Sequence, residues 1–161
     1  MTLAQTIRII ERVAGSQPAV HTVVRNDVYR LNELADARYG VFAWTQGQHS
    51  ASADGSLQYF RFTFFYVDRL TEDKGNETEI QSVGIDVLRN VVLSLYKREI
   101  WASGDVNFTT FNQRFVDECA GVFCSVALEV PADMVCPDDF TPSPEPAGDY
   151  NDDYNDDFLI Y

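Results

Sequence analysis

The side chains of this chain that could take part in chemistry are two histidines, three cysteines and a large excess of carboxylates. A metal site or a catalytic triad brings histidine together with acidic or nucleophilic partners at recognisable spacings. His21 and His49 are far apart in the sequence, and neither belongs to such a spacing. A Gly-rich phosphate loop and a nucleophile elbow are not found either. The sequence therefore predicts no catalytic residue, no cofactor and no metal ligand, and we expect that the protein is not an enzyme.

Carboxylates before the C-terminal segment could in principle pair for acid–base catalysis or hold a cation. The candidates are Asp68, Glu72, Asp73, Glu77, Glu79, Asp86, Glu99, Asp117 and Glu118. Most of them fall in predicted loops or on the polar face of a predicted helix, which is typical of a solvated surface. A hydrolase that depends on Mg²⁺, Mn²⁺ or Ca²⁺ held by these carboxylates is kept as the third alternative.

The cysteines Cys119, Cys124 and Cys136 leave one thiol unpaired in any disulfide scheme, and they lack the paired short spacings of a zinc module. We expect reduced thiols, as in most intracellular proteins. A bridge between Cys119 and Cys124 across a turn is the alternative.

Composition narrows the class of protein further. A chain of 161 residues with 45% hydrophobic residues can bury the core of one domain. Its net charge of −13 argues against sequence-specific nucleic-acid binding, which relies on clustered Lys and Arg. The first residues alternate apolar with polar positions, unlike an export signal, and the apolar run 59–67 is interrupted by Arg61 and much shorter than the roughly 20 residues of a membrane span. We therefore expect a soluble, intracellular protein without a membrane partner.

The elements that must position these side chains begin with a helix. Thr2 and Gln5 form a capping box, and Gly15 is a stop signal. Alternating patterns over 39–46 and 57–67 predict two antiparallel strands joined by a polar tip, while the segment 20–37 is left open between strand and helix. The strand 57–67 is apolar on both faces, so we expect one face to pack on helices and the other to meet another chain.

A second helix is predicted after Asn76, where Glu79 repeats the capping pattern, and Lys97 and Arg98 are expected in its last turn. Its apolar stripe consists of Ile80, Val83, Gly84, Val87, Leu88, Val91, Val92 and Leu95. Strands over 106–117 and 122–130 follow, with a turn expected at Ala120–Gly121. This order predicts an α+β fold: a mainly antiparallel sheet with two helices packed on one face.

Residues 137–161 form a separate segment, which we call the C-terminal arm, after a domain of residues 1–136. Eight of the chain's net negative charges lie in it: Asp138, Asp139, Glu145, Asp149, Asp152, Asp153, Asp156 and Asp157. It cannot bury enough apolar surface to order alone, and no glycine stands where a calcium loop needs one. Aromatic and aliphatic anchors nevertheless accompany the acids, so we expect the arm to order against a neighbouring protein. The predicted partner-binding residues are Tyr150, Asp152, Asp153, Tyr154, Asp156, Asp157, Phe158, Leu159, Ile160 and Tyr161.

Three stretches carry a resemblance to a known class of proteins: YVDRLTEDKGNE (Tyr66–Glu77), IQSVGIDVL (Ile80–Leu88) and FNQRFVDECAGVFC (Phe111–Cys124). Over roughly 39–136 the chain resembles virion proteins of phages that infect Bacteroidetes, notably the crAss-like phages. The order of elements is also similar to the tail-terminator, or tail-completion, fold of head–tail connectors.

This resemblance implies a structural subunit of the phage neck or tail, made in the host cytoplasm and incorporated into the virion. It implies a closed homo-oligomeric ring, hexameric or dodecameric, between the portal or connector and the tail, with DNA passing through the lumen. Its partners would be copies of itself and neighbouring ring, portal and tail proteins. The resemblance carries no active-site residue with it. The alternative is an acidic binding module or inhibitor that acts on a basic protein partner.

Overall fold

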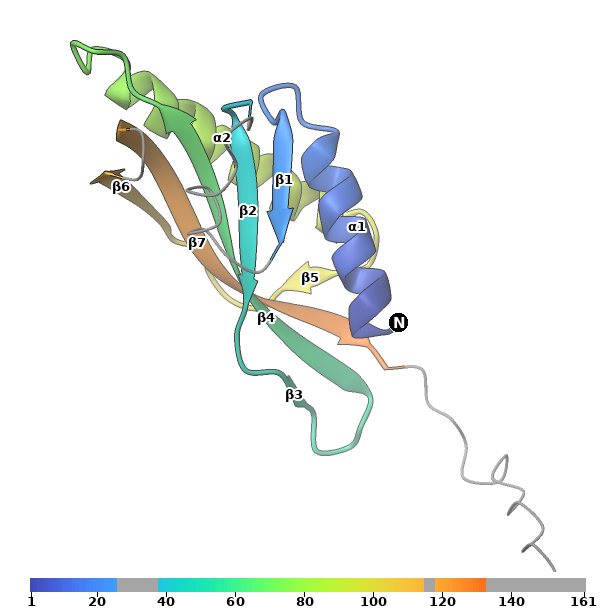
Figure 1. Ribbon diagram of the computed structural model, residues 1–161. Coiled ribbons are helices and arrows are strands. Elements are labelled where there is room, and N and C mark those ends of the chain that lie inside the picture. Colours follow the sequence, from blue (N-terminus) through green and yellow to red (C-terminus); the bar gives the residue numbers. More distant parts are fainter. Residues whose placement is uncertain (26–37, 115–117, 133–161) are drawn as a thin grey trace, which may run out of the picture.

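Two helices pack on one face of a single twisted sheet in the computed structural model, which describes residues 1–25, 38–114 and 118–132 (Figure 1). The predicted α+β class is therefore confirmed. The sheet has seven strands in the order β1-β2-β4-β7-β5, with β3 pairing to β4 and β6 to β7. The strands are β1 (Thr22–Arg25), β2 (Val41–Gln46), β3 (Ser50–Ala51), β4 (Leu57–Arg69), β5 (Trp101–Ala102), β6 (Phe108–Arg114) and β7 (Glu118–Pro131).

Helix α1 (Leu3–Gly15) begins as the sequence predicts. The backbone N–H of Gln5 donates to the Thr2 hydroxyl at 3.3 Å, and the Gln5 side-chain oxygen accepts from the Thr2 N–H at 2.7 Å. This capping box satisfies two N–H groups that the first turn leaves without partners. The buried face of the helix then carries Ile10, Val13 and Ala14 into the core.

The long hairpin of β2 and β4 is confirmed, with antiparallel pairing from Val41 opposite Val67 to Gln46 opposite Phe62. Its polar tip contains the short strand β3, which folds back on the first half of β4. Strand β1 adds a feature that the sequence left open, because it pairs parallel to β2 and makes the sheet mixed. The helix considered after Asn26 lies outside the described residues.

Helix α2 (Glu77–Tyr96) buries most of the predicted stripe: Ile80, Gly84, Val87, Leu88, Val91 and Leu95. Its ends differ from the prediction. The Asn76 side chain makes no capping bond, because its amide is used by the preceding loop, where it accepts from the Thr71 N–H and donates to the Arg69 carbonyl. Lys97 and Arg98 lie just after the last turn, although Arg98 still reaches back to the Ser94 carbonyl at 2.9 Å.

The turn expected at Ala120–Gly121 is wrong, because both residues lie within β7. Gly121 is opposite Val67 of β4, and a Cβ at this position would stand 2.3 Å from the Tyr66 carbonyl oxygen. A glycine is therefore required by the close approach of two strands. The connection between β6 and β7 includes residues 115–117, which are outside the described part.

The core lies between the sheet and the helices. Alternate residues of β7, from Val122 to Val130, point into it, and Phe62, Phe64 and Tyr66 of β4 pack beside them. Gly84 lets α2 approach the sheet closely, because a Cβ there would lie 2.9 Å from Val122. The domain therefore has two outer surfaces, the solvent side of the helices and the face of the sheet that the helices do not cover.

Candidate interaction surfaces

The face of the sheet opposite the helices carries apolar side chains, as predicted. These side chains are less exposed to solvent than expected. Val24, Val41 and Ala43 form a small buried cluster against Phe65. The register places Phe65 opposite Phe123, with ring centroids 5.9 Å apart, and Phe111 lies 6.2 Å from Phe123. These three rings cover one another and are only partly exposed. We call Phe65, Phe111 and Phe123 the aromatic row.

Polar residues occupy the same face further along the strands. They line a depression of about 550 Å³, whose residues are Gly47, Arg61, Phe62, Thr63, Ser103, Ser125, Val126 and Ala127. The hydroxyls of Thr63 and Ser125 are 3.1 Å apart, and the Arg61 side chain is exposed beside them. A guanidinium and two hydroxyls could bind a carboxylate. The one charged residue among the described residues that line this depression, Arg61, is exposed to solvent, so its interaction with a carboxylate would be weakened by water.

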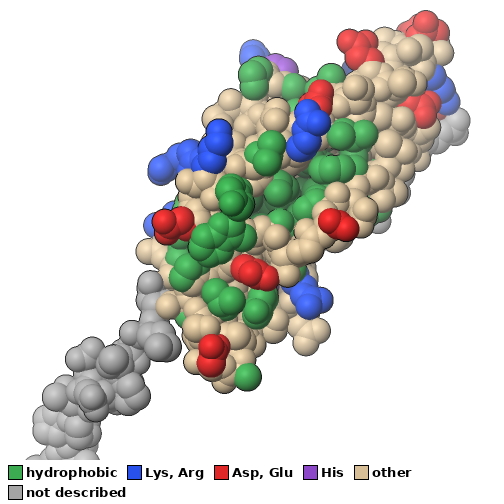
Figure 2. All heavy atoms as spheres, turned by 180° about the vertical axis from the view of Figure 1, so that it is seen from behind, with side chains coloured by type: hydrophobic (Ala, Val, Ile, Leu, Met, Phe, Trp, Pro, Cys, Tyr) green, Lys and Arg blue, Asp and Glu red, His purple; other side chains and the backbone are tan. Residues whose placement is uncertain are grey.

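The helix side carries the exposed hydrophobic surface that sequence reasoning missed. Among the described residues, the large hydrophobic side chains with more than half of their surface exposed are Leu93 and Tyr96 of α2, at 53% and 63%. Partly buried Ile85 and Val92 of α2 extend the apolar character. Figure 2, which shows the side on which α2 lies, displays hydrophobic side chains gathered in a band, with both basic and acidic side chains beside it. We call Ile85, Val92, Leu93 and Tyr96 the helix-side band.

A groove of about 450 Å³ lies along the outer side of α1 and is lined by Met1, Gln5, Arg8 and Ile9. Met1 and Ile9 give it an aliphatic part, and Gln5 and the exposed Arg8 complete its lining. The backbone nitrogen of Met1 donates to the Pro131 carbonyl at 3.1 Å. The end of β7 therefore lies next to the groove.

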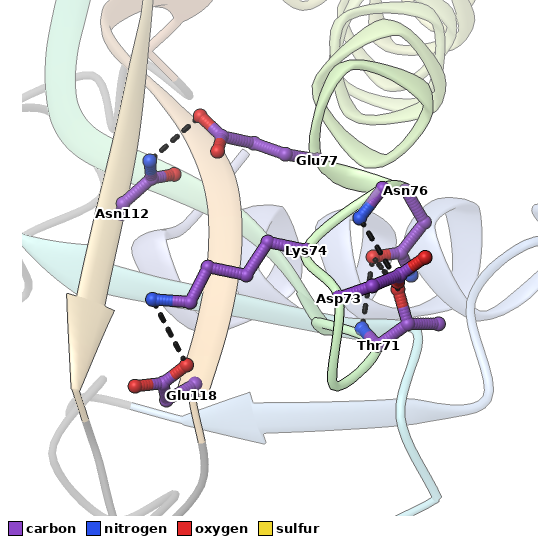
Figure 3. A network of polar contacts seen from close by, with 8 residues as sticks. Thr71, Asp73, Lys74, Asn76, Glu77, Asn112 and Glu118 are labelled. Atoms are coloured by element: carbon purple, nitrogen blue, oxygen red, sulfur yellow. Dashed lines mark hydrogen bonds and ion pairs between the residues drawn. The ribbon is translucent and has the colours of Figure 1, made fainter.

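A polar network joins the loop before α2 to the sheet (Figure 3). Within the loop, the Thr71 hydroxyl donates to Asp73 at 2.6 Å, which with the Gly75 N–H lowers the pKa of that carboxyl. Two contacts join this region to the strands. Asn112 of β6 donates to Glu77 of α2 at 2.6 Å, and Lys74 of the loop pairs with Glu118 of β7 at 3.2 Å. These carboxylates serve as acceptors that fix the start of α2 over β6 and β7.

Cys119, Cys124 and His49 likewise have structural positions in the described fold. Cys119 and Cys124 are buried in β7 at odd and even positions, hence on opposite faces of the sheet, which excludes the bridge considered between them. Burial raises the pKa of Cys124 to about 12, so its reactive thiolate is suppressed. His49 accepts from the Arg61 N–H at 3.3 Å and contacts Gln46 at 3.2 Å, which fastens the hairpin tip. Cys136 lies outside the described residues.

The carboxylates considered for a hydrolase are not brought together by the described fold. Nowhere in residues 1–25, 38–114 and 118–132 do three His, Cys, Asp or Glu side chains gather as a metal site would require. Asp117 lies outside these ranges. The prediction that the protein is not an enzyme stays a prediction, and the third alternative gains no support from the described side chains.

The ten predicted partner-binding residues, from Tyr150 to Tyr161, all lie outside the described part of the chain. Neither described helix has the length and apolar character to cross a membrane. A scan against protein-family models gives no match for this chain, and a search of curated proteins gives none either.

Proposed function

We propose that this chain is a structural subunit of a larger assembly, and specifically a ring-forming protein of a phage neck or tail. The observation that supports this most is the exposure of Leu93 and Tyr96 within the helix-side band. Contiguous exposed apolar surface, flanked by charged side chains, is typical of protein–protein interfaces. The phage assignment itself rests on the sequence resemblance over residues 39–136.

Burial of Leu93 and Tyr96 against a neighbouring chain would stabilise an interface. Full burial of a large apolar side chain is worth about 1.5–3 kcal/mol, and Leu93 and Tyr96 leave more than half of their surface in water. Covering them with a neighbour would therefore contribute about 1–2 kcal/mol for each side chain. These two residues are the expected centre of the interface, where a few anchors carry most of the binding energy.

A ring also needs two different surfaces on each subunit, since head-to-tail contacts join unlike patches. The chain offers them on opposite layers: the helix-side band on one, and the aromatic row of Phe65, Phe111 and Phe123 on the other. Two unlike patches suit head-to-tail association better than a two-fold dimer, which uses one patch twice. Such association closes into a ring when each contact rotates the next copy by a fixed fraction of a full turn.

Imaging of the intact particle tests the proposed location. We expect that phage particles from the source of this chain, decorated with an antibody against it, carry the label at the neck or tail. Particles that lack the label, while the protein accumulates in the infected cell, would contradict a virion role.

The second candidate is an acidic module that binds a basic protein, favoured by the net charge of −13 and by the acidic C-terminal arm. Affinity purification of the tagged full chain separates the two functions. Recovery of ring, portal and tail proteins favours the first, whereas recovery of one basic enzyme in a salt-sensitive complex favours the second.

A further inference from the structure

The groove on α1 lies where the described chain ends. Pro131 closes β7, and its carbonyl accepts from the backbone nitrogen of Met1, one of the groove residues. The N–H of Ala132 donates to the Ser56 carbonyl at 3.0 Å, which holds the last described residues against the hairpin tip. Any segment that follows Ala132 therefore starts beside the groove.

The groove and the segment after Ala132 are complementary in charge and in apolar character. Arg8 and Arg12 are exposed on α1, and neither makes an ion pair within the described part of the chain. Every charged residue between Asp133 and Tyr161 is acidic. Met1 and Ile9 give the groove an aliphatic lining of the kind that aromatic anchors fill. Tyr150, Tyr154 and Phe158 recur at intervals of four among those acids.

We propose that residues 149–161 bind in this groove on α1 of their own chain, with the aromatic anchors against Met1 and Ile9 and the aspartates near Arg8 and Arg12. The segment between Ala132 and the arm is long enough for residues 149–161 to return to the groove. An extended chain spans up to about 3.5 Å per residue, so residues 133–149 can cover several tens of ångströms. Attachment next to the groove raises the effective concentration of the arm to about the millimolar range, well above that of a second copy in dilute solution. The contact is thus made within one subunit.

Protease protection in the full chain tests this contact. Chymotrypsin cleaves after aromatic residues, so binding slows cleavage at Tyr150, Tyr154 and Phe158. The substitution Arg8→Glu should accelerate that cleavage about two- to fivefold, the range that a surface ion pair supplies. Arg38→Glu is the matched control, because Arg38 is also exposed and undergoes the same change of charge but is not one of the groove residues, and it should leave the rate unchanged. Equal acceleration by both variants, or by neither, would overturn the proposal.

Amide NMR on the ¹⁵N-labelled full chain locates the contact and decides which chain supplies it. Replacing the three anchors together, Tyr150→Ser, Tyr154→Ser and Phe158→Ser, should shift the amide resonances of Gln5, Arg8 and Ile9 and leave Ser125 and Ala127 unmoved. The shifts should not depend on protein concentration over about a hundredfold range, since the contact is intramolecular. Unchanged α1 resonances would refute the site, and shifts that appear only at high concentration would assign the arm to a neighbouring copy and refute binding within one chain.

Discussion

Gly121 occupies a position in β7 where the backbone of β4 leaves no room for a side chain. A Cβ there would lie 2.3 Å from the Tyr66 carbonyl oxygen and 2.7 Å from the Phe111 ring. The aromatic ring could move, but the carbonyl belongs to the central strand pair of the sheet. This single residue therefore couples the spacing of β4 and β7 to the aromatic row on the second face.

We predict that Gly121→Ala lowers the free energy of unfolding by about 3 kcal/mol or more, as overpacking against backbone does. Gly15→Ala is the matched control, because it lies at the end of α1 with its nearest neighbour 3.9 Å from the added methyl group. That change should be neutral or stabilising by up to about 1 kcal/mol. Urea unfolding of both variants measures the difference, and a Gly121→Ala protein as stable as the parent would show that the strands can separate at this point.

Asp54 illustrates how the hairpin tip holds its shape. Its carboxylate accepts from the Ser52 hydroxyl at 2.6 Å and from the Ser56 hydroxyl and N–H, and these bonds lower its pKa from 3.8 to about 2. A depressed folded pKa stabilises the tip above the unfolded pKa, and that contribution is lost as pH falls through the folded pKa. The stability difference between the parent and Asp54→Asn should therefore shrink as the pH is lowered from about 4 to about 2.

An NMR pH titration of the Asp54 carboxyl checks the same point directly. Ser52→Ala removes the hydrogen bond that contributes most, so the pKa should move upward toward 3.8. A titration that is the same in the Ser52→Ala variant would show that the bond does not stabilise the ionised carboxylate.

At the scale of elements, helix α2 is held in place from both sides. Its buried stripe packs on β4 and β7, while the network of Figure 3 fixes its first turn to the edge of the sheet. The Asn76 amide belongs to this attachment, because it joins Arg69 at the end of β4 to Thr71 in the loop. The orientation of α2, and with it that of the helix-side band, depends on these contacts.

We predict that Asn76→Ala lowers the free energy of unfolding by about 1–2 kcal/mol, since three side-chain hydrogen bonds at a partly exposed site are lost. Asn90→Ala, at an exposed position in the middle of the same helix, should be neutral or slightly stabilising because alanine favours helix. Urea unfolding of the two variants provides the comparison. Equal effects of the two substitutions would show that the loop attachment adds nothing to stability.

Local patterns predicted the elements that depend on neighbouring residues in the chain. The capping box of Thr2, the stripe of α2 and the alternation of β4 and β7 are all periodic or short-range signals, and the structure has them. The parallel pairing of β1 with β2 and the requirement for Gly121 arise from strands distant in sequence, which no local pattern records.

The candidate surfaces were harder to predict than the fold for the same reason. Leu93 and Tyr96 differ from the buried residues of α2 only in the direction they point, and the broad apolar pattern of the helix hides that difference. Their spacing of three positions, off the main stripe, is the signal that could have found them. The groove on α1 depends on the meeting of Met1 with Pro131, at opposite ends of the described chain.

For the whole molecule, the C-terminal arm and the folded domain should be separable. Removal of all residues after Pro137 leaves intact every described contact of the core, so we expect the truncated chain to fold, with an unfolding midpoint lowered only by the loss of the arm's contact on α1. If the arm also contributes to assembly, the truncated chain should assemble more weakly than the full chain, as measured by sedimentation at matched concentrations. Unchanged assembly would show that the arm takes no part in the contacts between subunits.

The central claim is that the helix-side band is covered by other protein chains. The mass of the full-length protein in solution, measured by sedimentation for the parent and for the double variant Leu93→Ser with Tyr96→Ser, tests it most directly. The account predicts a closed multiple of the 18.2 kDa chain for the parent, and a shift of the variant to monomer without loss of folding, because both side chains are exposed in the single subunit. A parent that stays monomeric at every concentration, or a variant that assembles equally well, would contradict it.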